Sequence, residues 1–329
     1  MSPKLAIAAA ALLCALSLPA AVTVGPVPIP VGTSWRAVVS PSSDPSMHEV
    51  IVRQLRLPRV LLGFLVGASL ALAGGVMQGL FRNPLASPYL LGIAAGAAAG
   101  AAGAIALGFP GPAALPVGAF LGGSSAVLLV YRLALSRTGR SSPLGLILAG
   151  VALGAAFSAL TSFLLFISAG DRRLAEILFW TMGGLGRSCW SYVWVLLPVA
   201  GVGAILVQGF ARDLNALSLG EEGAFHLGVE PERLRRVLVV VATALTSTAV
   251  AFAGTVGFVG LITPHLIRLL LGPDHRVLFP ASFLVGGTFL VWADAAARTA
   301  CQPAELPVGV ITALVGAPFF LALLRRRLP

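Results

Sequence analysis

Two titratable residues, Asp294 and His265, stand inside long apolar runs of this 329-residue sequence. In an apolar environment a carboxylate or an imidazole is a candidate for a proton relay or an ion site. Arg298 follows Asp294 by four residues, which places the two side chains on one face of a helix within ion-pair reach. We therefore interpret Asp294 as a partner of Arg298 rather than as a relay. We interpret His265, which stands in a Pro-His motif at a predicted helix start, as structural.

Other kinds of chemistry have little support in the sequence. Cys14, Cys189 and Cys301 form no CxxC and no metal-ligand spacing, so we predict no disulfide and no bound metal. Neither HExxH nor GxSxG occurs, which disfavours a membrane-embedded enzyme. A P-loop requires Gly-Lys-Ser/Thr, and the only lysine is Lys4. The chain therefore has no P-loop.

The composition of the chain indicates which kind of secondary structure contains Asp294 and His265. Hydrophobic residues make up 57% of the chain and charged residues 10%, and the mean hydropathy is +0.95. Soluble chains carry about 25% charged residues. The net charge is +10, and the basic residues lie between apolar runs rather than along one polar face, which disfavours nucleic-acid binding. We predict an all-α polytopic membrane protein, because helices pair their backbone groups internally in lipid.

About ten apolar runs are near the length that crosses a bilayer as a helix. We place them near residues 4–24, 57–80, 88–107, 113–135, 143–167, 190–209, 236–253, 258–271, 278–297 and 306–324. The eighth run is short for a full crossing, which is typical of a broken or partly buried segment. The first run resembles a secretory signal, but it is longer than a usual signal core, and we favour a retained helix.

Arginine placement predicts the orientation, because basic residues concentrate in cytoplasmic loops. With a cytoplasmic N-terminus, the inner arginines are Arg82, Arg132, Arg137, Arg140, Arg212, Arg233, Arg235, Arg236, Arg276, Arg325, Arg326 and Arg327. The outer arginines are then Arg36, Arg53, Arg56, Arg59, Arg172, Arg173, Arg187 and Arg298. The inner excess favours two cytoplasmic termini. The outer group is larger than the rule predicts and requires another explanation.

Two pairs of matching segments indicate an internal repeat. Ala-Gly-x-Val, Pro and Gly recur at the same offsets from Ala73 and from Ala253, and Pro143-Leu-Gly-Leu-Ile matches Pro307-Val-Gly-Val-Ile. A repeat unit of five helices reverses the second copy, because five is odd. We predict one transmembrane domain over 1–329, in inverted five-helix halves near 1–170 and 171–329.

Several longer motifs resemble one family, the FecCD-type permeases that import vitamin B12, haem and ferric siderophores. The matching segments are Arg56-Leu-Pro-Arg59, Gln78-Gly-Leu-Phe-Arg-Asn-Pro-Leu-Ala86, Leu219-Gly-Glu-Glu-Gly-Ala-Phe-His-Leu-Gly228, Gly257-Phe-Val-Gly-Leu-Ile-Thr-Pro-His265, Asp274-His-Arg276 and Glu305-Leu-Pro-Val-Gly309. The family motif residues among them are Asn83, Pro84, Pro264, His265 and Pro307. The resemblance implies ten helices per subunit, a homodimer around one pathway, two separate ATPase subunits that bind ATP and magnesium, and a periplasmic binding protein.

Residues 212–236 form the only sizeable polar insertion on the predicted inner side, and apolar residues recur there at helical spacing. An amphipathic loop of this kind can lie on the lipid surface. The resemblance instead implies a pair of coupling helices that docks onto the ATPase. Its candidate residues are Leu217, Gly220, Glu221, Ala224, Leu227 and Gly228.

On the predicted outer side, Arg56, Arg59 and Arg298 match positions where the family presents arginines to a binding protein. Arginine suits this role because its planar guanidinium grips carboxylates with two hydrogen bonds. The alternative for Arg298 is the ion pair with Asp294. The resemblance also implies a pathway lined by the span from Pro143 and by residues 171–180. The inner end of that span holds the gate residues Ser142, Pro143 and Leu144, where an apolar constriction can block leakage by dewetting.

The sequence therefore predicts a permease subunit, itself without enzymatic activity or cofactor, in the inner membrane of a bacterium. We expect a ferric siderophore as its substrate, with haem or cobalamin as alternatives. A rival interpretation is an ion-coupled secondary transporter, which can also contain inverted repeats. Such a transporter needs intramembrane carboxylates, and Asp294 is the one candidate.

Overall fold

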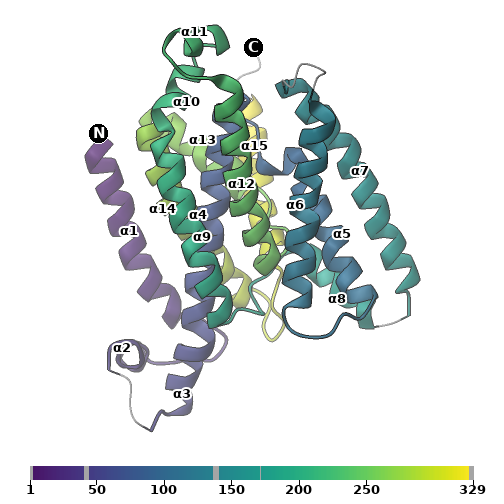
Figure 1. The fold of residues 1–329 in the computed structure, drawn as a ribbon. Helices are drawn as coiled ribbons and strands as arrows, with labels where there is room; N and C mark the ends of the chain where they lie inside the picture. The colour runs from purple at the N-terminus through teal and green to yellow at the C-terminus, as the bar shows by residue number, and fades with distance from the viewer. Residues whose placement is uncertain (1–2, 41–43, 136–140, 171, 326–329) are drawn as a thin grey trace.

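The computed structural model describes residues 3–40, 44–135, 141–170 and 172–325, and in this part of the chain the regular structure is helical apart from one isolated bridge between Leu135 and Ser141. Figure 1 shows the helices packed side by side as a bundle. The helices of the first half are α1 (Pro3–Thr23), α2 (Val31–Val39), α3 (Met47–Val50), α4 (Leu57–Leu80), α5 (Ile93–Ala106), α6 (Ala114–Ala134) and α7 (Pro143–Ile167). Those that follow are α8 (Arg172–Thr181), α9 (Trp190–Gly209), α10 (Ala211–Leu217), α11 (Glu221–His226), α12 (Pro231–Ala253), α13 (Val259–Leu271), α14 (His275–Thr299) and α15 (Val308–Arg325).

Ten of these helices correspond to the ten predicted spans, which confirms the polytopic all-α fold. Seven helices or continuous helical runs in the described residues are long and apolar enough to cross a membrane, and α5, α13 and α15 are shorter apolar helices. The predicted boundaries are accurate to a few residues, except at the starts of α5 and α12. Helix α12 begins at Pro231 rather than near 236, because a proline is well tolerated in the first turn of a helix.

The predicted span 88–107 is wrong in one respect, because it is not a continuous helix. A short 3₁₀ helix covers Pro88–Leu91, Gly92 adopts a left-handed conformation with φ of 76°, and α5 starts only at Ile93. The second half contains a similar break, since Phe258, with φ of 67°, precedes the 13-residue α13. The expectation of a short or broken eighth span is therefore confirmed, and the same feature recurs in the first half.

Helices α4 and α12 run in opposite directions in Figure 1, as do α7 and α15, and the division into inverted halves near 1–170 and 171–329 stays a prediction. Pro143 opens α7 and Pro307 directly precedes α15, so this matched pair occupies equivalent places. The other matched pair does not. Gly74 lies inside α4, whereas Gly254 follows the end of α12. That similarity reflects the common composition of the helices rather than equivalent positions.

The core is built around α4, in which nearly every residue after Val60 is buried. Helix α4 packs against α14, α12 and α13. A methyl group added at Gly74 would lie 1.7 Å from the carbonyl oxygen of Gly260, so the two backbones touch at this point. Helices associate closely in lipid when small residues let their backbones approach. Replacement of either glycine would force α4 and α13 apart.

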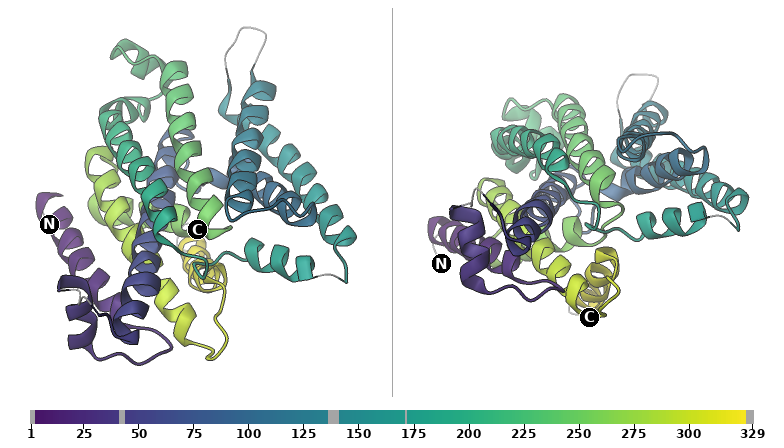
Figure 2. Two further views of the ribbon diagram at one scale, coloured as in Figure 1. Left: turned by 60° about the horizontal axis from the view of Figure 1, so that its bottom comes forward. Right: turned by 90° about the horizontal axis from the view of Figure 1, so that it is seen from below.

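The bundle has two ends, which we name by their helices (Figure 1). The α11 end contains α10 and α11, the start of α1 and the end of α15. The α8 end contains α2, α3 and α8, and α8 lies across this end rather than along the bundle (Figure 2). The cytoplasmic location of both termini stays a prediction, which agrees with the start of α1 and the end of α15 lying at one end of the bundle. Arg137, Arg140, Arg326 and Arg327 lie outside the described residues.

Helix α1 packs along α14, and the indole nitrogen of Trp292 donates to the hydroxyl of Ser17 at 3.1 Å. Helix α7 differs from α1 in having few neighbours. Its buried residues are Leu146, Gly150, Thr161 and Leu164. Large apolar side chains such as Phe163 and Phe166, 58% and 77% exposed, leave this helix with an unpartnered apolar surface.

Candidate functional site

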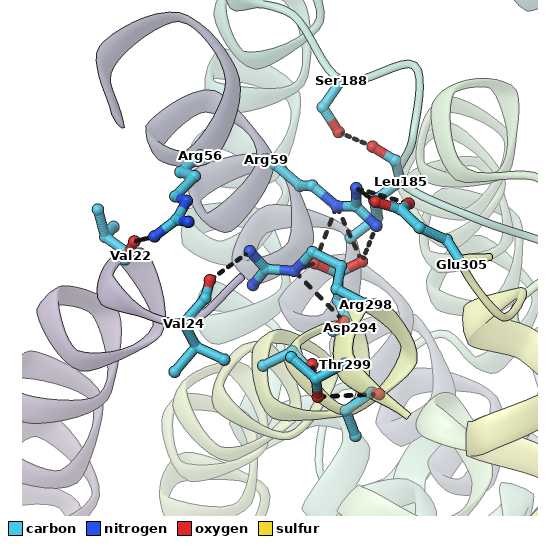
Figure 3. A network of polar contacts seen from close by, with 12 residues as sticks. Val22, Val24, Arg56, Arg59, Leu185, Ser188, Asp294, Arg298, Thr299 and Glu305 are labelled. Atoms are coloured by element: carbon cyan, nitrogen blue, oxygen red, sulfur yellow. Dashed lines mark hydrogen bonds and ion pairs between the residues drawn. The ribbon is translucent and has the colours of Figure 1, made fainter. Parts of the chain in front are cut away.

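A cluster of charged residues, which we call the α8-end cluster, joins four segments near the α8 end (Figure 3). Its members are Arg56, Arg59, Asp294, Arg298 and Glu305. Arg56 ends the short π-helix Ile51–Arg56 that leads into α4, and Arg59 lies in the first turn of α4. Asp294 and Arg298 come from α14, and Glu305 from the segment before α15. Arginines predicted to be on the outer side therefore meet inside the protein.

Asp294 is the centre of the α8-end cluster, with a side chain 2% exposed. The guanidinium of Arg59 contacts both of its carboxylate oxygens at 2.9 to 3.1 Å. Arg298 approaches from the other side at 2.9 Å, as the spacing of four residues predicts. A buried carboxylate requires such pairing, because its desolvation is otherwise very costly. The interpretation of Asp294 as an ion-pair partner is confirmed by these contacts.

Two arginines of the cluster also bind the end of α1. Arg56 donates to the carbonyl oxygens of Val22 and Thr23 at 3.2 and 2.9 Å and also to that of Val27. Arg298 donates to the carbonyl oxygen of Val24 at 2.9 Å. The last carbonyl groups of a helix have no partner within the helix, so these contacts cap α1. They account for part of the arginine excess on the predicted outer side.

The role of Arg56, Arg59 and Arg298 in docking a binding protein stays an untested prediction, and the geometry offers it no support. Arg56 and Arg298 are 4% and 2% exposed, and the side chain of Arg59 is 12% exposed. Arg59 is also bound to Glu305 at 2.9 Å. A carboxylate of another protein would have to displace these internal partners before it reached any of the three.

A cleft of about 630 Å³ opens beside the α8-end cluster, between α8 and the segment before α15. Its charged lining residues are Arg59, Arg172, Glu176, Arg187 and Glu305. Its aromatic lining residues are Phe179, Trp180, Tyr192 and Phe252. Pro307 of the family motif lines it as well. The cleft therefore borders the segment that the sequence predicts at the pathway, and its described lining has three cations and two anions.

At the opposite end, α10 and α11 occupy the predicted coupling segment. Leu217 and Ala224 are 1% and 0% exposed and pack in the core of the chain, so they position the helices and make no contact surface. Leu227, by contrast, is 63% exposed. Gly220 and Gly228 have φ values of 108° and 82°, a conformation that favours glycine at helix ends.

The outward surface of α11 contains side chains that the sequence analysis did not select. Phe225, on α11, is 67% exposed, and Leu219 and Leu227, which flank α11, are 71% and 63% exposed, so three apolar side chains are exposed in and beside this helix. Their exposure was not evident from helical spacing. Helix α11 has only six residues, and the chain breaks at Gly220 between α10 and α11, so the apolar periodicity of α10 does not continue into α11. The assignment of this segment to coupling remains a prediction.

The predicted gate residues lie at the start of α7. The hydroxyl of Ser142 accepts a hydrogen bond from the backbone nitrogen of Gly145 at 2.9 Å, so Ser142 caps the helix. Pro143 occupies the first turn, where its missing N–H has no cost. Leu144 is 66% exposed. The structure thus gives Ser142 and Pro143 a helix-start role, and a role in gating stays a prediction.

The other family motif residues have structural contacts. Asn83 accepts from the backbone nitrogen of Leu85 at 2.9 Å and shapes the turn that contains Pro84. Pro264 and His265 are both buried inside α13, so His265 is not at a helix start as predicted. Asn215 of α10 donates to Asp274 at 2.7 Å and ties α10 to the start of α14. Hydrogen bonds from Arg276 hold the pKa of Asp274 well below its usual range.

A second polar cluster, which sequence reasoning missed, lies near the α11 end, and we call it the α11-end cluster. Its members are Tyr131, Ser141, Glu221, Glu232 and Arg235. The one signal available in the sequence is the spacing of three residues between Glu232 and Arg235, which makes a pair on one helix face. The contacts to α6, α7 and α11 arise from tertiary packing.

The bundle, its paired broken segments and its two polar ends define a polytopic membrane protein of the transporter type. The sequence model of the FecCD transport family matches residues 11–326, and the chain belongs to this family. Relatives support the assignment along most of the chain. The cobalamin import system permease protein BtuC of Halobacterium salinarum is 48% identical over 86% of this chain and 75% of its own length.

Two further relatives match at similar length. The hemin transport system permease protein HmuU of Yersinia pestis is 42% identical over 89% of this chain and 88% of its own, and the Fe(3+) dicitrate transport system permease protein FecD of Escherichia coli is 40% identical over 92% of both chains. A solved structure of a metal-chelate type ABC transporter in an inward-facing conformation covers 98% of this chain and 99% of its own, with 35% identity and a TM-score of 0.87. The chain is accordingly a permease of the ABC importer class.

Proposed function

We propose that this chain is the membrane-spanning subunit of a binding-protein-dependent importer that moves a ferric siderophore into the cytoplasm. Its partners in this proposal are a second copy of itself or a close paralogue, two cytoplasmic ATPase subunits and a periplasmic or lipid-anchored binding protein. The exposed apolar surface of α7 is available to the second copy. Both termini lie in the cytoplasm, and ATP and magnesium bind to the ATPase alone.

The observation that carries the proposal is the pair of short helices α10 and α11. They project from the tip of the bundle (Figure 1), where Leu219, Phe225 and Leu227 expose apolar side chains. An exposed apolar group rimmed by polar residues is typical of a protein contact site. The chain itself lacks a P-loop, so an ATPase subunit that binds this surface would supply the energy.

The rival interpretation, an ion-coupled secondary transporter, is disfavoured by the state of Asp294. Ion coupling requires a carboxylate that gains and loses a proton or a cation during transport. Asp294 is held by two arginines and is 1% exposed. A cation would have to compete with both guanidinium groups, which makes Asp294 unsuitable for this function.

The charge of the 630 Å³ cleft supports an anionic chelate as the substrate. Arg187 is paired with Glu176 at 2.6 Å, and Arg59 is paired with Glu305. Arg172 is then the additional cation of the described lining. Haem, with its carboxylates, is the alternative that fits the same charge. Cobalamin is a further alternative, since the relative named for cobalamin is 48% identical to this chain.

Reconstitution in proteoliposomes tests the proposal. The chain should be combined with the ATPase and binding protein encoded beside it, and uptake of ferric citrate, a ferric hydroxamate, haemin and cyanocobalamin measured with and without ATP. We expect ATP-dependent uptake of one of the iron chelates. Uptake by the chain alone would overturn the assignment to an ATP-driven importer, and uptake of cyanocobalamin only would overturn the substrate.

The docking surface for the binding protein is tested separately. Since Arg56, Arg59 and Arg298 have internal partners, we place docking on exposed arginines of the α8 end, among them Arg172, which lines the cleft and is not the arginine paired with Glu176. Arg172→Glu should weaken stimulation of ATP hydrolysis by the loaded binding protein, whereas Arg172→Lys, which keeps the charge, should retain most of it. Equal stimulation in both variants would contradict this placement.

A further inference from the structure

Arg235, in the second turn of α12, contacts three different segments of the chain although it is only 4% exposed. Its Nη1 donates to the carbonyl oxygen of Ser141 at 2.8 Å and to Glu232 at 2.7 Å, and its Nη2 donates to Glu221. Ser141 lies two residues before α7, and Glu221 is the first residue of α11. One guanidinium therefore connects the coupling segment to the start of α7.

Further hydrogen bonds fix the α7 side of this connection. The hydroxyl of Ser141 donates to Glu232 at 2.9 Å, and the backbone nitrogen of Ser141 donates to the same carboxylate at 3.3 Å. The hydroxyl of Tyr131, on α6, donates to Glu232 at 2.8 Å. Charge-assisted hydrogen bonds of this kind are short and strong. Ser141, Glu232 and Arg235 thus form one unit at the inner end of α7.

The α11 side of the connection is built differently. The side chain of Glu221 is 51% exposed, whereas those of Glu232 and Arg235 are 17% and 4% exposed. A half-exposed ion pair separates more easily than a buried one, because water solvates the released carboxylate. Arg235 remains neutralised by Glu232 when Glu221 leaves. The contact between α11 and Arg235 is therefore suited to change while the contacts to α7 persist.

We propose that Arg235 is a positioning residue that transmits a displacement of α11 to the start of α7, with Glu221 as its contact on α11. This inference rests on the proposed function, in which α11 receives the ATPase. When α11 moves, the contact between Glu221 and the guanidinium is made or broken. The guanidinium is then balanced differently between Glu221, Glu232 and the carbonyl group of Ser141, which shifts the helix start that contains Ser142, Pro143 and Leu144.

Labelling of a cysteine at the start of α7 tests the connection in the assembled complex with its ATPase. Leu144→Cys, in a chain whose three native cysteines are replaced, is treated with a maleimide in the absence of nucleotide and after trapping with ATP and vanadate. Leu144 is 66% exposed, so the new thiol is accessible. The ratio of the two labelling rates reports the response of α7 to the ATPase without requiring a transported substrate.

Glu221→Gln and Arg235→Gln should each move this ratio toward one, by about 2- to 30-fold, the range that coupling residues contribute. The double variant should be no worse than Arg235→Gln, because that variant already removes the contact to Glu221. Glu222→Gln is the matched control, since Glu222 is an exposed neighbour on the same helix, and it should keep the wild-type ratio. Arg235→Lys, which keeps the charge but not the fork, should be intermediate.

The outcomes distinguish a failure of the proposed function from a failure of the role of Arg235. A wild-type complex that fails to assemble with the ATPase, or that shows no nucleotide effect, would count against the proposed function. If the wild-type complex responds to nucleotide and Glu221→Gln, Arg235→Gln and Glu222→Gln all keep the wild-type ratio of labelling rates, the role of Arg235 is overturned and the proposed function is not. If Arg235→Gln fails to fold, Glu221→Gln decides the question, because it changes only a half-exposed side chain.

Discussion

The α8-end cluster and the α11-end cluster both contain buried arginines, but they distribute charge in opposite ways. In the α8-end cluster two arginines share one buried carboxylate, Asp294, which is 2% exposed. In the α11-end cluster one arginine, Arg235, is shared by two carboxylates, and one of them is half exposed. Removal of the shared partner leaves two neighbouring buried cations, Arg59 with Glu305 alone and Arg298 with a backbone carbonyl group, in the first case. In the second case it leaves two solvated or hydrogen-bonded carboxylates.

This difference indicates different functions for the two ends. The α8-end cluster fastens α1, α4, α14 and the segment before α15 to one another, and each of its arginines is occupied by internal partners. The α11-end cluster includes a partner that can leave. The same types of side chain can therefore build a clamp that holds the bundle or a connection that responds to another subunit. The burial of the carboxylates decides which of the two results.

The largest expected effect is on Asp294. Asp294→Ala leaves Arg59 and Arg298 buried beside each other without their shared carboxylate, and loss of one partner of a buried pair costs about 3–5 kcal/mol of stability. The midpoint of thermal unfolding of the purified protein in detergent measures it. Asp44→Ala, at an exposed position, is the control. A midpoint equal to that of the control would show that the α8-end cluster is not a clamp.

A smaller effect is expected from the carboxylate of the α11-end cluster that is less exposed. Glu232→Ala removes hydrogen bonds from Tyr131 and Ser141, but Arg235 keeps Glu221 and the carbonyl oxygen of Ser141. The expected loss is about 1.5–3 kcal/mol, the range for hydrogen bonds to a charged group. The same unfolding assay applies, with Glu222→Ala as its control. A loss as large as that of Asp294→Ala would remove the proposed distinction between the clusters.

The smallest effect is expected within the α8-end cluster itself. The side chain of Glu305 is 41% exposed, and its partner Arg59 keeps Asp294 when Glu305 is lost. Glu305→Ala should therefore cost about 0–1 kcal/mol, as exposed ion pairs do. Unfolding measurements on Glu305→Ala and Asp294→Ala side by side sharpen the comparison. Equal losses would mean that exposure of the carboxylate does not set the strength of these contacts.

Local patterns in the sequence predicted the features that depend on neighbouring residues. The apolar runs located the ten helices, because length and composition decide whether a segment can cross lipid. The pair of Asp294 and Arg298 followed from a spacing of four residues, which helix geometry alone brings together. The break after α12 was expected from the short run 258–271.

Features that depend on the packing of distant segments were not predictable in this way. Arg59 and Asp294 are 235 residues apart in sequence and meet because α4 packs along α14. The internal partners of Arg56 are backbone carbonyl groups, which leave no trace in the residue types. The break at Gly92 was overlooked because glycine is frequent in the apolar runs, so one left-handed glycine does not stand out.

The contacts that cap α1 constrain the order in which the protein is completed during synthesis. Arg56, which lies directly before α4, is available to bind the end of α1 early in synthesis. Arg298, which binds Val24, is 274 residues further along the chain than Val24 and emerges from the ribosome much later. The first helix made is thus fully fastened only when nearly the whole polypeptide has been translated. A nascent chain that stops before α14 would expose the polar end of α1 to lipid or to quality-control proteases.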